Sequence, residues 1–207
     1  MCGRYYIDYE VDLILGEIYE SLFLSGELDR FQSFREVFPD TIAATLVEDD
    51  KKAISVSAKR WGEKRGKFFV INARQETIFE KPMFKDAIER YRCVIPASGF
   101  YEWASVGRQK QKYKISSQRS EPIYMAGLYL PKQENDHYVI ITTASEGDMS
   151  FIHHRSPILL SADEYPEYLS SLSFARQRLA KPNEPLSIIP DAGDEPVQLS
   201  FLDLGLQ

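Results

Sequence analysis

The residue with the most distinctive chemistry stands at position 2. Cys2 follows Met1, and an initiator methionine is normally removed when the next residue is small, so we expect the mature chain to begin with Cys2. An α-amine with an unperturbed pKa of roughly 7.7–8.0 is partly neutral near pH 7 and attacks an aldehyde to give an imine. The thiol of the same residue can then add to the imine carbon and close a five-membered thiazolidine ring. The competing interpretation is that position 2 is arbitrary and the residue frays in solvent.

Two further segments carry polar side chains that suit a reaction site. Asn72 and Arg74 directly follow the apolar run 68–71, and they offer an amide for directed hydrogen bonds and a planar guanidinium for phosphate. Glu102 stands between two aromatic residues, where partial desolvation suits a carboxylate to general acid–base work. Each segment also has an ordinary interpretation. The first resembles many polar strand ends, and the second resembles an edge-strand carboxylate paired with a nearby basic group.

Two of the three histidines are adjacent, at positions 153 and 154, and Arg155 follows them. In an extended backbone, neighbouring side chains point to opposite sides. We therefore expect one ring to point into a site and the other away, and the pair not to chelate one metal ion. The residues alone leave open which of the two rings points inward. The alternative is a solvent-exposed pair in a loop.

Composition limits the classes of protein that fit these residues. The 207 residues are 43% hydrophobic and 27% charged, as in a folded protein, and this length favours one domain. Two cysteines cannot make a disulfide framework, and no short Cys/His cluster resembles a zinc site. We see no signal peptide and no apolar run long enough to cross a membrane. These features lead us to expect a soluble cytoplasmic protein.

Charge is distributed unevenly along the chain. The net charge of −6 argues mildly against nucleic acid as a partner. Residues 51–114, however, contain sixteen lysines and arginines against six acids, a net of +10 that leaves −16 for the remainder. This basic segment is either a phosphate-binding surface or the solvated outer face of several strands.

The elements that must position these side chains are mostly strands. Alternating or apolar runs predict strands over seven segments, namely 53–61, 67–72, 91–96, 100–104, 111–116, 123–130 and 137–143. A stripe of Leu15, Ile18 and Leu22 has helical spacing and predicts one helix. Further helices are expected over 82–88 and from about Tyr165.

These elements together predict an α+β fold. We expect a single domain over 1–207 with a strand-rich middle, in which 183–207 form an extended C-terminal tail rich in proline. Cys93 lies two residues into an apolar strand and is expected to be a small core residue.

Four of these segments resemble the SOS-response-associated peptidase family, also described as abasic site processing proteins. The matching segments are 1–5 (Met-Cys-Gly-Arg-Tyr), 72–77, 92–103 and 152–157 (Ile-His-x-Arg-x-Pro). Four motifs in the family's order are far more specific than any one of them. The resemblance implies a strand-rich, barrel-like antiparallel sheet core flanked by helices.

The resemblance also implies a reaction. The family detects abasic sites in single-stranded DNA and forms a covalent thiazolidine crosslink to the ring-opened sugar aldehyde. By resemblance, Cys2 is the nucleophile, and Asn72 holds the N-terminal residue and the opened sugar. Glu102 would manage proton transfers around the α-amine and the imine. His153 would act as acid–base at the sugar oxygen during ring opening and reversal.

Five residues are expected by the same resemblance to contact DNA: Arg4, Pro39, Trp61, Arg74 and Arg155. The first and fourth would hold flanking phosphates, and Trp61 could offer a stacking face in the DNA channel. The turn 61–66 is shorter and more basic than the family's apolar turn, so charge would there replace part of the stacking. Lyase chemistry and self-cleavage that frees the N-terminal cysteine are further implications of the resemblance.

Two other functions stay open at this point. A general N-terminal-nucleophile or Cys/His peptidase would use Cys2 to attack an amide, with His153 as its base and without DNA. A non-catalytic single-strand binding module would use the basic segment and form no covalent species. For the crosslinking function we expect no cofactor, no metal ion and no membrane. The expected partner is single-stranded DNA containing abasic sites, bound by a monomer that associates with the nucleoid when it acts.

Overall fold

The computed structural model describes residues 2–8, 13–25, 36–132 and 136–191. Within these residues the chain is a mixed α+β structure with a strand-rich core, which confirms the predicted fold class. The strands form two larger sheets and one short hairpin. No helix of the described residues is long and apolar enough to span a membrane.

Five strands of the larger sheet close into a ring. They are β3 (Ile42–Glu48), β4 (Ile54–Trp61), β8 (Arg92–Ala97), β11 (Ile123–Leu130) and β12 (His137–Ala144). Their order is β12, β4, β3, β8 and β11, and β11 pairs again with β12. The ring is antiparallel except for the pairing of β12 with β4, which is parallel. Every residue of β8 is buried, as in a strand that is covered on both faces.

Three short strands extend this sheet: β7 (Asn72–Arg74), β13 (Arg155–Pro157) and β14 (Leu159–Leu160). Strand β7 runs parallel to β12, and β13 runs antiparallel to it. Both pair with Thr142, as Arg74 and Pro157 respectively, so they lie on opposite edges of β12. Strand β14 pairs with β11.

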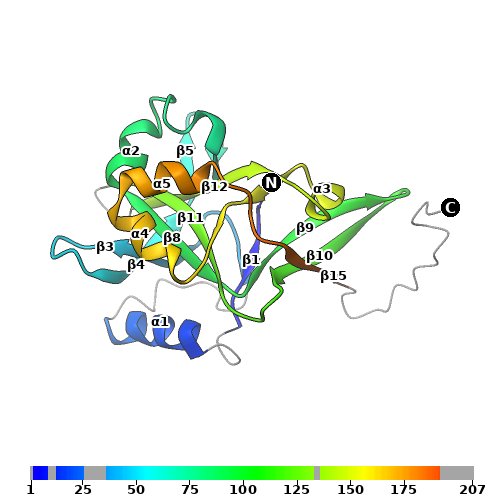
Figure 1. Ribbon diagram of the computed structural model, residues 1–207, viewed down its shortest axis with the longest axis horizontal. Helices are drawn as coiled ribbons and strands as arrows, with labels where there is room; N and C mark the ends of the chain where they lie inside the picture. The colour runs from blue at the N-terminus through cyan, green and yellow to red at the C-terminus, as the bar shows by residue number, and fades with distance from the viewer. Residues whose placement is uncertain (1, 9–12, 26–35, 133–135, 192–207) are drawn as a thin grey trace.

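The second sheet contains β1 (Tyr5–Tyr6), β2 (Glu36–Val37), β9 (Gly99–Val106), β10 (Gln109–Ser117) and β15 (Leu186–Pro190). Its order is β15, β10, β9, β1 and β2. Only Ser98 separates β8 from β9, so the two sheets are continuous along the chain. Figure 1 shows the β9–β10 hairpin reaching away from the ring. Part of the predicted tail therefore belongs to a sheet, since β15 pairs with β10, and residues 192–207 lie outside the described residues.

The hairpin of β5 (Glu63–Arg65) and β6 (Phe68–Val70) is inserted between β4 and β7. Both of its ends are bonded to β12. The Gly62 N–H donates to the Tyr138 carbonyl at 2.8 Å, and the Ile71 carbonyl accepts from the Ile140 N–H at 3.2 Å. The single strand predicted over 67–72 is therefore wrong, because the chain leaves the hairpin at Ile71 and joins a different sheet.

Helices cover the ring from two sides. They are α1 (Leu13–Leu24), α2 (Lys85–Arg90), α3 (Met149–Ile152), α4 (Glu164–Ser170) and α5 (Leu172–Leu179), with a 3₁₀ turn η2 at Gln75–Thr77. In Figure 1, α2, α4 and α5 gather on one side, whereas α1 lies on the other side against β3 and β4. The predicted stripe of Leu15, Ile18 and Leu22 is buried, as expected. The helix predicted over 82–88 begins later, at Lys85.

Aromatic residues fill the core near the start of the chain. Trp61, Tyr5 and Tyr138 are fully buried, and the Tyr5 and Tyr138 hydroxyls lie 2.8 Å apart. The Trp61 ring stacks on Tyr138 with 6.1 Å between centroids. Cys93 is completely buried in β8, which confirms its predicted place in the core. These contacts give the first strand a rigid support.

Candidate active site

Cys2 lies immediately before β1 and is completely buried. Its Sγ contacts the Arg4 carbonyl oxygen at 4.0 Å. Its own carbonyl oxygen accepts a hydrogen bond from Asn72 Nδ2 at 2.9 Å. The structure thus brings together two of the predicted site residues that are seventy positions apart in sequence.

Asn72 is placed by the parallel pairing of β7 with β12, where it lies opposite Ile140. Its amide nitrogen is used by Cys2, but its Oδ1 is buried and has no hydrogen-bond partner among the described residues. A buried carbonyl oxygen without a partner is costly, by about 1–3 kcal/mol. This atom is therefore a ready acceptor for a hydroxyl or N–H group that enters the site.

Glu102 lies on β9 opposite Tyr113 and is only 4% exposed. It is close enough to Cys2 to act on the thiol electrostatically. Burial raises the pKa of the Cys2 thiol well above its usual value, and the Glu102 carboxylate raises it further. The thiol is therefore protonated at neutral pH, and a carboxylate beside it can exchange protons with groups that react there.

His153 terminates α3, a helix that contacts β9, the strand of Glu102. Its Nδ1 lies 3.0 Å from the Arg155 backbone nitrogen, which donates to it, and 3.1 Å from the Arg155 carbonyl oxygen. The backbone of Arg155 therefore holds the imidazole ring in position, either by donating to Nδ1 or, in the other tautomer, by accepting from it.

The two histidine rings do not point to opposite sides, so that expectation is wrong. They stack on each other with 4.3 Å between centroids, which lets their π faces make contact. His154 is exposed, and the nearby His153 lowers the pKa of its imidazole. His153 is half-buried and is the more inward of the two.

Arg4 and Pro39 lie at the edge of the second sheet. The Arg4 guanidinium stands 4.3 Å above the Phe38 ring and 5.3 Å from the Trp103 ring, and it pairs with Glu36 at 3.4 Å. Pro39 is half-buried in the turn after β2. The side chain of Arg4 remains about one third exposed, so it can still reach a phosphate.

The two other arginines predicted to contact DNA differ from each other. Arg74 is exposed at the end of β7 and makes no ion pair with any described residue. Arg155 is occupied. Its guanidinium makes a bidentate pair with Glu76 at 2.5 and 3.0 Å, and only 11% of its side chain is exposed. The geometry fits Arg74 to a phosphate better than Arg155.

Trp61 cannot offer a stacking face to DNA in this structure, so the role predicted for it is wrong. Its side chain is fully buried, its Nε1 donates to the Ile71 carbonyl at 3.0 Å, and its ring is covered by Tyr5 and Tyr138. Trp61 packs in the core against Tyr5, the first residue of β1, and does not line a channel.

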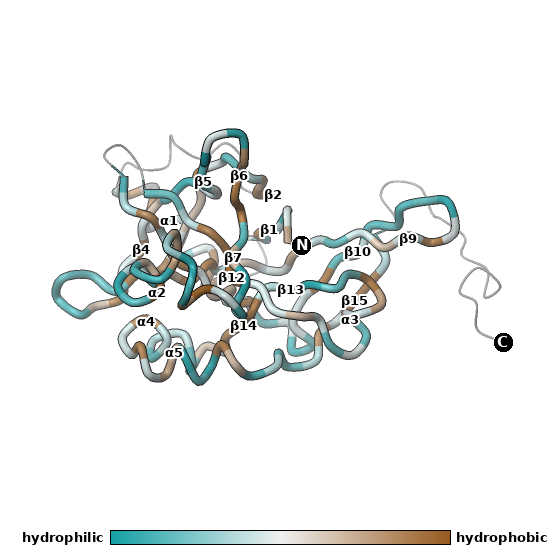
Figure 2. The backbone as a smooth tube through the Cα atoms, turned by 90° about the horizontal axis from the view of Figure 1, so that it is seen from above, coloured by the Kyte–Doolittle hydropathy of each residue, from teal (hydrophilic) through white to brown (hydrophobic). Residues whose placement is uncertain are grey.

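Exposed aromatic residues occur instead on the β5–β6 hairpin. Phe68 is 65% exposed and Phe69 is 45% exposed, and the Lys67 ammonium lies 5.5 Å from the Phe68 ring centroid. Figure 2 shows β6, the strand of both phenylalanines, as a hydrophobic stretch next to the hydrophilic β5. Sequence reasoning missed these residues as a surface, although two adjacent phenylalanines beside a basic turn are a signal that could have found them.

The basic segment 51–114 does not form one continuous surface. Lys59 is buried and pairs with Asp136 at 2.8 Å, and Arg92 is buried with its nitrogens bonded to backbone carbonyls. Other cations are paired, as Arg60 is with Asp40. Part of the positive charge therefore supports the fold, and the remainder is spread over several elements.

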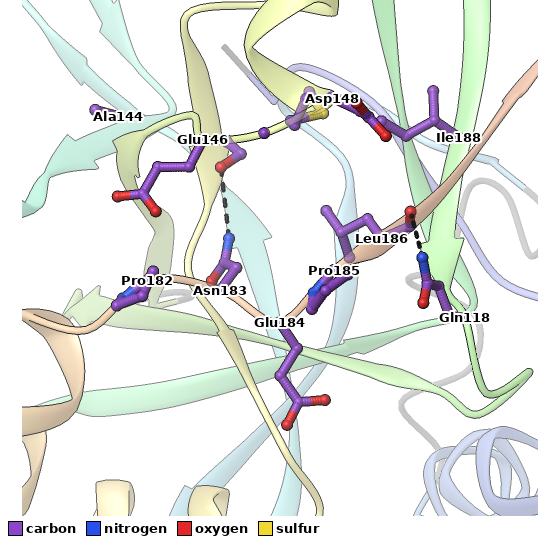
Figure 3. A pocket seen from close by; sticks show the side chains of 13 residues that line it. Gln118, Ala144, Glu146, Asp148, Pro182, Asn183, Glu184, Pro185, Leu186 and Ile188 are labelled. Atoms are coloured by element: carbon purple, nitrogen blue, oxygen red, sulfur yellow. Dashed lines mark hydrogen bonds between the residues drawn. The ribbon is translucent and has the colours of Figure 1, made fainter.

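A cavity of about 330 Å³ lies between α3, β13 and the segment before β15 (Figure 3). Its lining includes Glu146, Asp148 and Glu184 but none of the predicted site residues. Within the part of the chain that the structure describes, no group of three or more His, Cys, Asp or Glu side chains is arranged to hold a metal ion. The candidate active site is thus formed by Cys2, Asn72, Glu102 and His153.

Comparisons with known proteins identify relatives of this chain in sequence and in fold. Residues 1–190 match the family described as SOS response associated peptidase (SRAP). The chain is 32% identical over 185 residues to the abasic site processing protein YoaM of Bacillus subtilis, covering 82% of this chain and 79% of YoaM. It is 31% identical over 140 residues to the abasic site processing protein YedK of Escherichia coli, covering 64% of this chain and 63% of YedK. The crystal structure of a phage-related protein from Bordetella bronchiseptica matches with a TM-score of 0.70 and 24% identity, over 91% of this chain and 93% of that one.

Proposed function

This chain belongs to the SOS response associated peptidase family, and on that premise we propose that it processes abasic sites in single-stranded DNA by forming a covalent crosslink through Cys2. The relatives YoaM and YedK are named as abasic site processing proteins. The abasic sugar in its ring-opened form carries an aldehyde, and the proposal requires that Met1 is removed so that Cys2 has a free α-amine.

The reaction then proceeds in two steps. The neutral amine of Cys2 attacks the aldehyde carbon, a C–N bond forms, and the oxygen leaves as water to give an imine. The Sγ next forms a bond to the same carbon, and the thiol proton passes to the imine nitrogen. The product is a thiazolidine ring, and no oxidant, reductant or metal ion is consumed.

Three residues assist these steps. Glu102 accepts and returns the protons of the amine and the imine, because its carboxylate lies beside Cys2. Asn72 holds the Cys2 carbonyl through Nδ2 and offers its Oδ1 to a sugar hydroxyl. His153 transfers a proton at the sugar oxygen when the ring opens.

The observation that carries the proposal is the hydrogen bond from Asn72 to the Cys2 carbonyl, with a second, unpartnered Asn72 atom beside it. A buried terminal residue held by its own backbone is preorganised, which lowers the entropic cost of the reaction. A frayed N-terminus would have neither the burial nor the bond.

We propose that DNA is held by Arg4 and Arg74 at phosphates and by the Phe68 face at a base. Arg74 is exposed, and Phe68 presents an aromatic face beside Lys67. Base stacking on aromatic side chains contributes about 1–3 kcal/mol per base. We propose a single chain as the acting unit, because the four reacting side chains come from one chain.

A general Cys/His peptidase fits the geometry less well. Such an enzyme attacks with a thiolate, whereas burial and Glu102 raise the pKa of the Cys2 thiol. A protonated thiol beside a neutral amine favours the order in which the amine reacts first. Cleavage of peptides other than the protein's own N-terminus is therefore not part of the proposal.

The experiment is intact-mass analysis before and after mixing with single-stranded DNA that carries one abasic site. We expect a mass without Met1 and, after mixing, a denaturant-resistant adduct that has lost one water. Cys2→Ala should abolish the adduct, and Cys93→Ala, at the other cysteine, should retain it. A folded protein that begins with Cys2 and gives no adduct would refute the proposal.

A further inference from the structure

His154 is exposed to solvent, and the proposed reaction does not use its imidazole. The ring stacks on His153 with 4.3 Å between centroids and an angle of 29° between the ring planes. Whereas the Arg155 backbone holds His153 Nδ1, the His154 ring makes no hydrogen bond with the other residues that the structure describes. Its nitrogens are therefore available to a ligand that arrives from solvent.

Two arginines come close to this ring from different segments. Arg155 follows His154 directly, and the Ser145 N–H donates to the His154 carbonyl at 3.1 Å, which extends the pairing of β13 with β12 by one position. Arg74 ends β7, and Glu76, two residues after it, is bonded to the Arg155 guanidinium, so the two segments are in contact. The positive charges of both arginines act on the His154 ring.

These charges favour a neutral His154 ring in the free protein. The pKa of its imidazole is lowered first by His153, and then by desolvation, by the amino terminus and by the two arginines. The neighbouring acids are Glu76, which is bonded to Arg155, and Glu146, which lies two residues beyond the end of β12. The sum of these groups lowers the pKa from an ordinary value of about 6.5, so the ring is largely neutral above about pH 7.

A DNA phosphate bound at these groups would reverse the balance. Its negative charge offsets the two arginines and favours the charged form of the imidazole. The protonated ring then donates a charge-assisted hydrogen bond to a phosphate oxygen, which is about twice as strong as a bond between neutral groups. Binding of the strand and protonation of His154 therefore favour each other. Because stacked imidazoles resist double protonation, His153 and His154 together take up at most one proton.

We propose that His154 is a phosphate ligand that takes up one proton from solvent when single-stranded DNA binds, and that Arg74 holds the backbone beside it. The inference rests on the proposed function, because it adds a contact to the strand that carries the abasic site. Since the pKa of His154 is low in the free protein and higher in the complex, the added affinity is complete below the free pKa. It is lost as the pH rises through the pKa of the complex.

The test is the affinity for undamaged single-stranded DNA as a function of pH, measured by fluorescence anisotropy at constant ionic strength. For the wild type we expect the affinity to fall about 3- to 10-fold between pH 6 and pH 8. His154→Gln should bind more weakly at pH 6 and lose most of this dependence. His154→Lys, which is charged throughout this range, should bind tightly and show little dependence on pH.

The matched control is His137→Gln. His137 contacts Glu63 at 2.9 Å and has no part in the proposed phosphate contact, so this variant should keep the pH dependence of the wild type. Calorimetry in two buffers of different ionisation enthalpy should show proton uptake on DNA binding by the wild type and much less by His154→Gln. The ring C–H resonances of His154 should titrate at a higher pH with DNA than without it.

Three outcomes would overturn the proposal. One is an affinity of the wild type that does not change with pH, and another is a pH dependence that His154→Gln retains in full. The third is a titration midpoint of His154 that DNA leaves unchanged. Because these measurements use undamaged DNA, failure of the wild type to form an adduct with abasic DNA would refute the proposed crosslinking separately.

Discussion

At the scale of single residues, the proposed reaction uses two nucleophiles of Cys2, an amine and a thiol, that differ in how readily they react. Cys2 is buried, and its thiol is held protonated by burial and by the Glu102 carboxylate. An amine needs only to be neutral, whereas a thiol must lose its proton to become a strong nucleophile. In the proposed reaction, the thiol would therefore be protected from alkylation and oxidation until an imine forms.

Asn72→Ala tests the support of the terminal residue. The change removes the hydrogen bond to the Cys2 carbonyl and the buried Oδ1 acceptor. Because the Cys2 carbonyl oxygen would be left buried without a partner, which costs about 1–3 kcal/mol, we expect crosslinking to slow about 10- to 100-fold. Single-turnover kinetics measure the rate, and an unchanged rate in a folded variant would exclude the role of Asn72.

Trp61 and Phe68 make a matched pair of aromatic substitutions. Trp61→Phe loses the hydrogen bond to Ile71 and leaves a cavity, so we expect about 2–4 kcal/mol lower unfolding free energy and no change in DNA affinity. Phe68→Ala should leave stability nearly unchanged and weaken single-strand binding by about 1–3 kcal/mol. Urea titration and fluorescence anisotropy with undamaged DNA measure the two quantities. The reverse pattern would restore Trp61 as a DNA contact.

At the scale of elements, a buried carboxylate holds the β5–β6 hairpin to the body in addition to the backbone bonds at its two ends. Glu63 is 2% exposed and contacts Lys132 at 2.8 Å, His137 at 2.9 Å and Arg65 at 3.2 Å. Burial alone would raise the pKa of Glu63, but the hydrogen bond from Lys132 and the neighbouring cations lower it overall. The hairpin is thus fixed by charges drawn from several segments.

Glu63→Gln should loosen this hairpin. We expect about 1–3 kcal/mol lower unfolding free energy and faster hydrogen exchange at the Val70 amide, because Lys132 and His137 lose their common partner. Since the folded pKa of Glu63 is lowered, its contribution is present above about pH 4.3 and is lost as pH falls through the folded pKa. The variant should therefore lose less stability than the wild type between pH 5 and 3. Equal loss in the two proteins would exclude Glu63 as the anchor.

The sequence was informative where periodicity is local. The predicted strand 123–130 agrees with β11, and the fold class is confirmed. Strand β3 was not predicted, because nearly all of its residues are buried and the pattern does not alternate. The parallel pairing of β7 with β12 joins residues almost seventy positions apart, and nothing in the local pattern specifies such a contact.

The candidate site shows the same limit. The resemblance to a family selected Cys2, Asn72, Glu102 and His153, which the structure places on elements that contact one another. It could not reveal that Arg155 is occupied by Glu76, since an ion pair depends on the packing of three strands. Burial of Trp61 likewise depends on Tyr5 and Tyr138, which come from distant segments.

At the scale of the whole molecule, the distribution of charge is less segregated than the sequence suggested. Buried pairs such as Lys59–Asp136 use part of the positive charge within the fold. The cations that remain exposed are spread over several elements, among them the hairpin, β7, α2 and the turns that follow β3 and β9. Binding to DNA should therefore depend on a few phosphate contacts, and its salt dependence should be modest.

The two buried thiols should make the unfolding free energy fall as the pH rises into the alkaline range. An unfolded thiol ionises from about pH 8.5, whereas burial raises the pKa of Cys93 to about 12 and that of Cys2 well above its usual value. Unfolding therefore releases protons above pH 8.5, and the unfolding free energy should fall by about 1.4 kcal/mol per pH unit for each thiol. Urea titrations between pH 8 and 10 measure the slope. Cys93→Ala should reduce this slope by about 1.4 kcal/mol per pH unit, the contribution of one thiol. An unchanged slope would contradict a raised pKa for the Cys93 thiol.

The attachment of the β5–β6 hairpin has a consequence for how such proteins diversify. Gly62, before the hairpin, bonds to Tyr138 of β12, and Ile71, after it, bonds to Ile140, so both ends of the insertion are anchored close together on one strand. Lengthening a loop with fixed ends costs only about 0.6 kcal/mol for each doubling of its length. A hairpin of different length or sequence could therefore replace β5–β6 without displacing Trp61 before it or Asn72 after it.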